Sequence, residues 1–260
     1  MRRLTTPLLV IALAVLVIAL AGCASIEHYK NEQAKNERLV ETQVQLGVGY
    51  YEQGKYEVAL EKLEKALEVK SDYGPAHNAI ALVYEQIQKY DLADEHYRRA
   101  ISLSPEDGGT YNNYGVFLCK QNRAKQAENY FIKAVQIPLY ATPELAYENA
   151  GACARRIPDA VKAEAYLNKA LELNPDLPTA LINMAEIRFE QERFLSSRGF
   201  LQRYEALSPH NAESLWLAIR VEHKLGDKNA EAIYKKQLQS QFPKSEQFRM
   251  MLNSLEKDQS

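Results

Sequence analysis

Features of nucleic-acid-binding proteins and of sheet proteins are scarce in this chain of 260 residues. Lysine and arginine number 32 against 34 aspartates and glutamates, which gives a formal net charge of −2, and no run of basic residues is present. The composition therefore indicates no nucleic-acid partner. Runs of β-branched residues with alternating polarity are also missing, whereas alanine, leucine, glutamate, lysine and glutamine dominate, so the composition favours helices.

Catalytic and metal-binding motifs are missing as well. No histidine lies in the HExxH or Cys-His spacings that bind zinc: His28, His77, His96, His210 and His223. The glycines around Gly47 and Gly49 do not form a nucleotide-binding motif, because Glu52 stands where the third glycine is needed and no strand precedes it. Neither GxSxG, nor a Walker loop, nor a paired acid motif occurs. We therefore expect no enzyme, no cofactor, no metal site and no small-molecule substrate.

Cysteine occurs only three times, and the first cysteine closes an N-terminal targeting segment. Arg2 and Arg3 form its basic start, and residues 8–20 form an apolar run shorter than the about 20 residues of a membrane span. Leu20-Ala21-Gly22-Cys23 follows, which is the pattern of a bacterial lipoprotein signal. It predicts a signal peptide over residues 1–22 and lipidation of Cys23. An ordinary cleaved signal peptide or a short N-terminal helix is the alternative interpretation.

The residues after Cys23 predict where the mature chain resides. Ala24 follows the cysteine instead of aspartate, so the common inner-membrane retention signal is absent. Several acyl chains on one cysteine give lasting anchorage. Residues 24–39 are polar and lack an apolar stripe until Leu39, so we interpret residues 23–39 as the lipidated N-terminus and a tether. We expect a protein anchored by lipid to the outer membrane, on its periplasmic face.

A repeat of 34 residues fills most of the remaining chain. Small and aromatic residues recur at fixed positions in six copies, of which the sixth is degenerate: 40–73, 74–107, 108–141, 144–177, 178–211 and 212–243. A closing proline stands at position 32 of four copies: Pro105, Pro175, Pro209 and Pro243. This period and pattern are typical of tetratricopeptide repeats, each of which is a helix–turn–helix unit that buries its apolar face only by stacking. We therefore predict an all-α, right-handed superhelical solenoid of six repeats, with a C-terminal capping helix and tail over 244–260. An unrelated helical bundle is the alternative.

The regular spacing within each copy has a packing explanation. Position 8, which is Gly47 in the first copy, must be small because the two helices of a repeat meet there. Positions 20 and 27 are also small, so that the second helix approaches its neighbours closely. Large residues at positions 7, 11 and 24, such as Leu46 and Leu63, are expected to fill the seam between helices.

Cys119 and Cys153 lie on the first helices of adjacent repeats. In an oxidising compartment two such thiols can pair. Neighbouring helices could bring their Cα atoms within range of a disulfide, but the spacing alone does not fix the direction of the side chains. A disulfide and two buried thiols both remain compatible with the sequence.

Stacked repeats present a groove lined by positions 2, 5, 9, 12 and 13 of the first helix of each repeat. In the first repeat positions 5, 9 and 12 are apolar, and with one residue of the second repeat they form a predicted partner-binding surface: Val44, Val48, Tyr51 and Leu82. Later repeats carry mixed residues there, such as Glu148, Glu186 and Arg220. An exposed apolar groove favours a protein partner. Alternatively, the tether or ordinary packing covers it.

Several segments resemble one family in particular. They are residues 111–119 (YNNYGVFLC), the junction residues 138–140 (PLY) and 142–144 (TPE), residues 148–154 (ENAGACA), residues 201–204 (LQRY) and residues 214–217 (SLWL). These segments and the lipoprotein signal are similar to the type IV pilus biogenesis and stability lipoproteins of the PilF/PilW type. The first-repeat residues 47–51 (GVGYY) also match the pattern of this family.

The resemblance implies a pilotin. Such a protein would bind subunits of the type IV pilus secretin, carry them to the outer membrane through its lipid and promote their assembly into a multimer. The rival interpretation is a generic periplasmic tetratricopeptide scaffold that serves envelope or peptidoglycan assembly.

Overall fold

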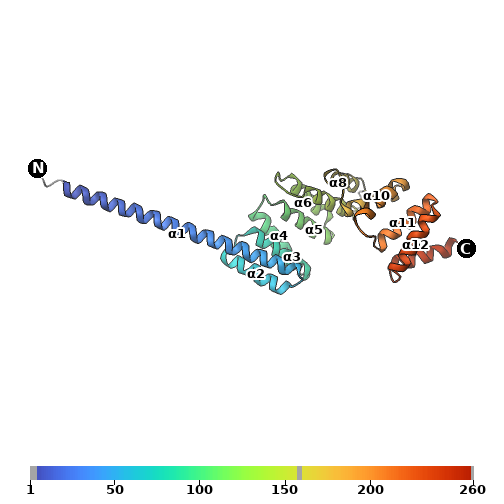
Figure 1. Ribbon diagram of the computed structural model, residues 1–260, viewed down its shortest axis with the longest axis horizontal. Coiled ribbons are helices and arrows are strands. Elements are labelled where there is room, and N and C mark those ends of the chain that lie inside the picture. Colours follow the sequence, from blue (N-terminus) through green and yellow to red (C-terminus); the bar gives the residue numbers. More distant parts are fainter. Residues whose placement is uncertain (1–4, 157–159, 259–260) are drawn as a thin grey trace. The chain divides into compact units, whose positions relative to one another are not determined.

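The computed structural model describes the backbone of residues 5–156 and 160–258, and the side chains of residues 27, 29–156 and 161–254. Within these ranges the chain forms thirteen helices and no strand (Figure 1). The helices are α1 (Thr5–Glu52), α2 (Tyr56–Val69), α3 (Gly74–Gln86), α4 (Tyr90–Leu103), α5 (Gly108–Lys120), α6 (Ala124–Gln136), α7 (Pro143–Ala154), α8 (Ala160–Leu173), α9 (Pro178–Glu190), α10 (Phe194–Leu207), α11 (Ala212–Leu225), α12 (Lys228–Gln241) and α13 (Glu246–Asp258). The predicted tetratricopeptide solenoid is confirmed.

The contacts divide the chain into two compact units. The first unit comprises residues 1–105 with repeats 1 and 2, and the second unit comprises residues 106–260 with repeats 3 to 6. Within each repeat the two helices pack antiparallel against each other and are joined by a short turn.

Among the described residues, the turns inside five repeats each contain one residue with a left-handed backbone. Gly54 and Gly226 have φ values of 71° and 75°, and the non-glycine residues with positive φ have values of 58–60° at the same place in their repeats: Gln88, Asn122 and Glu192. Glycine adopts this conformation without steric cost, whereas for other residues it costs about 1–2 kcal/mol. The turn geometry is therefore imposed by the packing of the two helices and not by glycine alone.

Helix α1 is much longer than the first helix of a repeat. Its C-terminal end packs beside α2 and α3, and its N-terminal part extends beyond them (Figure 1). Residues 24–39, which we expected to form a tether, continue this helix. They contain no glycine or proline, and local pairs such as Lys35 with Glu32 support the helix. Their role as a tether stays a prediction.

The first unit is held together by an apolar core. Ala59, Leu63, Ala79, Ile80 and Val83 form one buried cluster that joins repeats 1 and 2. Position 8 is indeed tight, because a Cβ atom built on Gly47 would lie 2.5 Å from Leu63 Cγ. The expectation for Leu46 is wrong: this side chain is 44% exposed, since repeat 1 has no preceding repeat to pack on.

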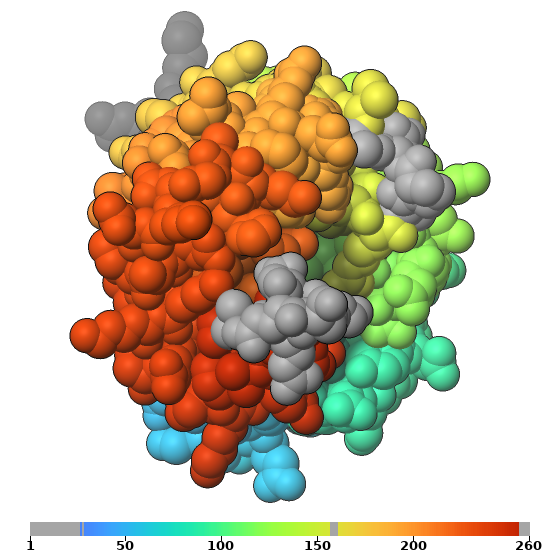
Figure 2. Space-filling view, turned by 90° about the vertical axis from the view of Figure 1, so that its right-hand side faces the viewer, coloured from blue at the N-terminus to red at the C-terminus, as the bar shows by residue number. Residues whose placement is uncertain are grey.

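The second unit repeats the same packing and adds directional links between repeats. Alanines at positions 20 and 27 are fully buried: Ala127, Ala134, Ala163 and Ala170. Cys119 of α5 and Cys153 of α7 are joined by a disulfide with their Cα atoms 5.9 Å apart. Figure 2 looks onto the C-terminal end of this unit, where α11 to α13 are coloured orange to red. Met251 of α13 packs with Leu215 and Leu238, so α13 covers the apolar face of the sixth repeat.

Candidate interaction surfaces

The four residues of the predicted partner-binding surface, which we call the first-repeat surface, all lie in the first unit. Val48 is 36% exposed, and the other three side chains are half-buried: Val44, Tyr51 and Leu82. Val44 packs against two buried clusters, one of them formed by Val40, Ala66 and Ala76. Val48 is therefore the accessible member of the surface, while Val44 serves mainly the core of the repeat.

Tyr51 links the first two repeats at the edge of this surface. Its ring lies 6.0 Å from the ring of Tyr56, and its hydroxyl oxygen accepts a long hydrogen bond of 3.4 Å from Gln86 Nε2. The aromatic side chain is thus partly used for packing. A partner on the first-repeat surface would contact Val48 and the remaining exposed edge of Tyr51.

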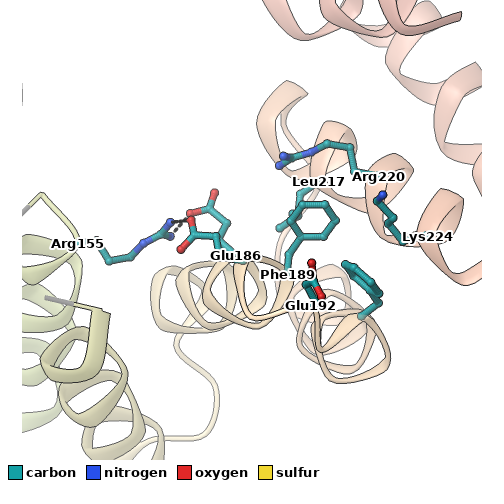
Figure 3. A pocket seen from close by; sticks show the side chains of 9 residues that line it. Arg155, Glu186, Phe189, Glu192, Leu217, Arg220 and Lys224 are labelled. Carbon is teal, nitrogen blue, oxygen red and sulfur yellow. Dashed lines mark hydrogen bonds and ion pairs between the residues drawn. The ribbon is translucent and has the colours of Figure 1, made fainter. Parts of the chain in front are cut away.

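A second candidate surface lies in the second unit and was not predicted. A cavity of about 450 Å³ opens between the C-terminal ends of α7, α9 and α11 (Figure 3). Its lining combines charged and aromatic side chains with one leucine: Arg155, Glu186, Phe189, Glu190, Glu192, Phe194, Leu217, Arg220 and Lys224. We call it the α9–α11 pocket.

One side of the α9–α11 pocket is an ion-pair network across two repeats. Arg155, which follows α7, donates to Glu186 and, over 2.8 Å, to Glu190 of α9. The guanidinium also donates to Asn183 Oδ1 over 3.2 Å. Figure 3 shows Arg155 and Glu186 pointing toward each other at this side. Both glutamates of α9 are therefore engaged by a cation within the protein.

The other side of the pocket is formed by Arg220, whose guanidinium lies over two aromatic rings. Its guanidinium carbon lies 4.6 Å from the ring centroid of Phe189 and 5.7 Å from that of Trp216. Contacts of this kind stabilise a cation over an aromatic face. Burial lowers the pKa of Arg220, and the charges of Glu186 and Glu190 act in the opposite direction. Because an arginine titrates far above neutral pH, the group remains a cation.

A smaller hollow adjoins the α9–α11 pocket. It has a volume of about 240 Å³ and shares Phe189, Arg220 and Lys224 with the pocket. Trp216 and Ile219 add apolar lining to it. The two cavities together form one continuous surface with Arg220 in its centre.

Sequence reasoning missed this surface although it had assigned Glu186 and Arg220 to groove positions. The first-repeat surface was predicted from apolar groove positions, and a cluster of cations with aromatic rings is not apolar. A useful signal would have been phenylalanine, tryptophan and arginine at groove positions of consecutive repeats. Glu148, in contrast, is not a groove residue: it is 8% exposed, and its Oε1 accepts a hydrogen bond of 2.8 Å from the backbone N–H of Ala180, at the start of α9. Burial raises the pKa of Glu148.

The remaining predictions concern the lipid anchor at Cys23 and the metal sites. The side chain of Cys23 lies outside the described residues, so its lipidation stays a prediction. Among the described residues, no helix is long and apolar enough to cross a membrane. Within the same residues, histidine, cysteine and acidic side chains nowhere form a group of three that could hold a metal ion.

Comparisons with known proteins identify the family. Tetratricopeptide-repeat models match residues 38–106 and 108–137. The type IV pilus assembly protein PilF of Pseudomonas aeruginosa is 30% identical over 233 residues, which cover 88% of this chain and 92% of PilF. A solved structure of PilF from the same organism matches with a TM-score of 0.80 and covers 85% of this chain and 99% of that chain, at 30% identity.

A second solved structure agrees. PilW, described as a widely conserved type IV pilus biogenesis factor, matches with a TM-score of 0.75 at 30% identity, over 82% of this chain and 98% of that chain. Because the similarity to PilF extends over nearly the full length of both chains, the chain belongs to the tetratricopeptide-repeat family of type IV pilus biogenesis proteins that includes PilF and PilW.

Proposed function

We propose that the chain is an outer-membrane lipoprotein that acts as a pilotin. It binds subunits of the type IV pilus secretin in the periplasm and promotes their delivery to the outer membrane and their assembly into a multimer. The observation that carries this proposal is the match to PilF, a type IV pilus assembly protein, over 88% of this chain and 92% of PilF. The lipoprotein signal that ends at Cys23 supports the proposed anchor.

The lipid gives the proposal a simple mechanism. A secretin subunit held by the repeats is carried to whichever membrane receives the acyl chains. Since an α-helix rises about 1.5 Å per residue, residues 23–39 of α1 would hold the first repeat about 25 Å from the lipid. This spacing leaves the first-repeat surface free of the membrane and open to a partner.

The proposed contact is the first-repeat surface. Val48 offers an exposed apolar side chain on a helix, and burial of such surface favours association by about 25 cal/mol per Å². A protein partner is also what a repeat solenoid commonly binds. We therefore infer that a segment of secretin covers Val48 and Tyr51.

The anchor is tested by Cys23→Ser, expressed from the full-length gene. The repeats should fold as in the wild type, because Cys23 lies well outside them, while the protein should leave the outer-membrane fraction and secretin multimers should fall. Incorporation of labelled palmitate into the variant would contradict the proposed lipidation site. Normal secretin multimers in cells that lack the whole protein would refute the pilotin function itself.

The contact is tested by Val48→Glu, with Val69→Glu as a matched control. Val69 of α2 is 39% exposed and belongs to the same unit, so both variants place a charge at similar exposure. We expect Val48→Glu to weaken capture of secretin at least tenfold and Val69→Glu to leave it unchanged, with melting temperatures close to that of the wild type for both. Equal capture by both variants would move the contact away from the first repeat.

A further inference from the structure

The cation at the centre of the α9–α11 pocket lacks a partner for one of its donors. Among the described residues, Arg220 Nε is a buried atom with no hydrogen-bond partner. A buried donor that stays unsatisfied costs about 1–3 kcal/mol, more when it carries charge. The rings of Phe189 and Trp216 hold the guanidinium in place but accept no conventional hydrogen bond from it. None of the ion pairs of the described residues includes Arg220, so its charge is available to an acceptor that enters the pocket.

The charges of the pocket favour an anionic acceptor. Arg155 engages two of the three lining carboxylates, those of Glu186 and Glu190. Arg220 and Lys224, one turn apart on α11, then stand as two cations against the remaining carboxylate of Glu192. Glu186 and Glu190 act on Arg220 only through their charges. A carboxylate that reached Arg220 would make a charge-assisted hydrogen bond in a partly desolvated site, which is among the stronger polar contacts in proteins.

The apolar lining defines what should accompany the carboxylate. Phe189, Phe194 and Leu217 line the pocket, and Trp216 and Ile219 line the adjoining hollow. These cavities lie on either side of Arg220 and are large enough for side chains of a peptide.

We propose that the α9–α11 pocket binds a segment of a partner protein in which an acidic side chain stands next to an aromatic or large aliphatic one. The carboxylate binds Arg220 and Lys224, and the apolar side chain fills the hollow beside Trp216. This site lies in the second unit and shares no residue with the first-repeat surface, so it goes beyond the proposed function. Its partner is defined by this chemistry alone.

The chain carries its own reporter for this site. Trp216 is the single tryptophan, so intrinsic tryptophan fluorescence follows the hollow directly. The probe is a capped hexapeptide, Ser-Ala-Phe-Glu-Ala-Ser, and the matched control peptide has glutamine in place of glutamate. The protein is the mature chain produced without its lipid. We expect the acidic peptide to change the fluorescence saturably, with a dissociation constant on the order of 1 mM, at least tenfold tighter than the glutamine peptide.

Variants separate the cation from the rest of the pocket. Arg220→Gln should remove the preference for the acidic peptide, whereas Arg203→Gln, which alters an arginine over the ring of Phe200 on α10, should preserve it. Lys224→Gln, at an exposed position, should weaken binding several-fold, and it tests the same idea if Arg220→Gln fails to fold.

Three outcomes would overturn the proposal. The first is equal affinity for both peptides, and the second is an unchanged Trp216 signal with either peptide. The third is a response to vesicles of anionic phospholipid combined with none to the acidic peptide, which would assign the pocket to a membrane surface. None of these outcomes affects the tests on Val48 and Cys23.

Discussion

The two units join their repeats by different means. In the first unit, the junction of repeats 1 and 2 is an apolar cluster centred on Leu63 and Ile80, with one long hydrogen bond from Gln86 to Tyr51 beside it. In the second unit, neighbouring repeats are also linked through the disulfide of Cys119 with Cys153 and through the hydrogen bond that Glu148 accepts at the start of α9. Apolar packing is non-directional, whereas these links fix the position of one helix against the next.

The difference has a consequence for stability. In a repeat protein each junction contributes separately, because a repeat contacts only its neighbours. Removal of a directional link should therefore lower the stability of one junction of the second unit. A larger residue at the close contact between the two helices of a repeat should lower stability equally in either unit, since this contact is built from small residues in both.

The largest effect is expected from the disulfide. Replacing Cys119 and Cys153 together by serine removes a cross-link that closes a loop of 34 residues. Loss of such a bond should lower the free energy of unfolding of the second unit by about 2–4 kcal/mol. Urea unfolding followed by the fluorescence of Trp216, which lies in that unit, measures the change.

A control keeps this prediction specific. Reduction of the wild type with a dithiol should reproduce the shift of the double serine variant, and reduction of that variant should add nothing. Mass spectrometry of unreduced, alkylated protein from the periplasm checks the bond directly. Two alkylated thiols there would show that Cys119 and Cys153 do not pair in the cell.

The repeat architecture was predictable because it depends on short-range spacing. Small residues recur at the places where helices meet, and the structure buries them: Ala59, Ala66, Ala93 and Ala100 are all fully buried. Such a pattern needs only helix geometry and the size of side chains. The exposed position of Leu46 was not predictable from the pattern, because it depends on the absence of a neighbouring repeat.

Other features depend on side-chain direction or on competing local preferences. The length of α1 follows from helix propensity in residues 24–39, a signal that a search for apolar stripes overlooks. Glu148 falls at a groove position by count, yet it turns inward to the N-terminus of α9. The α9–α11 pocket needs Arg155 to turn toward Glu186 and Arg220 to turn toward Phe189. Sequence spacing specifies neither direction.

A smaller effect, and a sharper comparison, is expected from two glycines of α1. Gly47→Ala would place a Cβ 2.5 Å from the buried Leu63 and should destabilise the first unit by about 1–3 kcal/mol. Gly49→Ala has no atom within 4 Å and should stabilise the helix by about 0.5–1 kcal/mol. Gly151→Ala, which meets Leu167 at 2.6 Å, should cost the second unit as much as Gly47→Ala costs the first.

Thermal unfolding followed by circular dichroism separates these three variants. A melting temperature of Gly47→Ala at or above that of the wild type would mean that Leu63 moves aside without cost. A much smaller loss for Gly151→Ala than for Gly47→Ala would mean that the directional links of the second unit relieve the clash, so the two seams are not alike.

The smallest effect is a pH dependence that should differ between the units. In the first unit, Nδ1 of His77 and Nδ1 of His96 lie 3.1 Å apart, so one ring must accept a hydrogen bond and stay neutral. Burial lowers the pKa of His96, the charge of His77 lowers it further, and Glu95 opposes both. In the second unit, burial also lowers the pKa of His210, but Glu205 acts in the opposite direction.

A lowered pKa in the folded state means that the unfolded chain binds the proton first. The contribution of His96 to stability is therefore complete above the unfolded value of about 6.5 and is lost as the pH falls from there toward the folded pKa. Urea unfolding of the first unit, followed by circular dichroism at a series of pH values, should show that the free energy of unfolding falls on acidification. His96→Gln should remove this fall. The transition of the second unit, followed by Trp216, should keep its pH dependence in that variant. A wild-type pH profile that His96→Gln leaves unchanged would show that His96 titrates in the folded protein as it does in the unfolded chain.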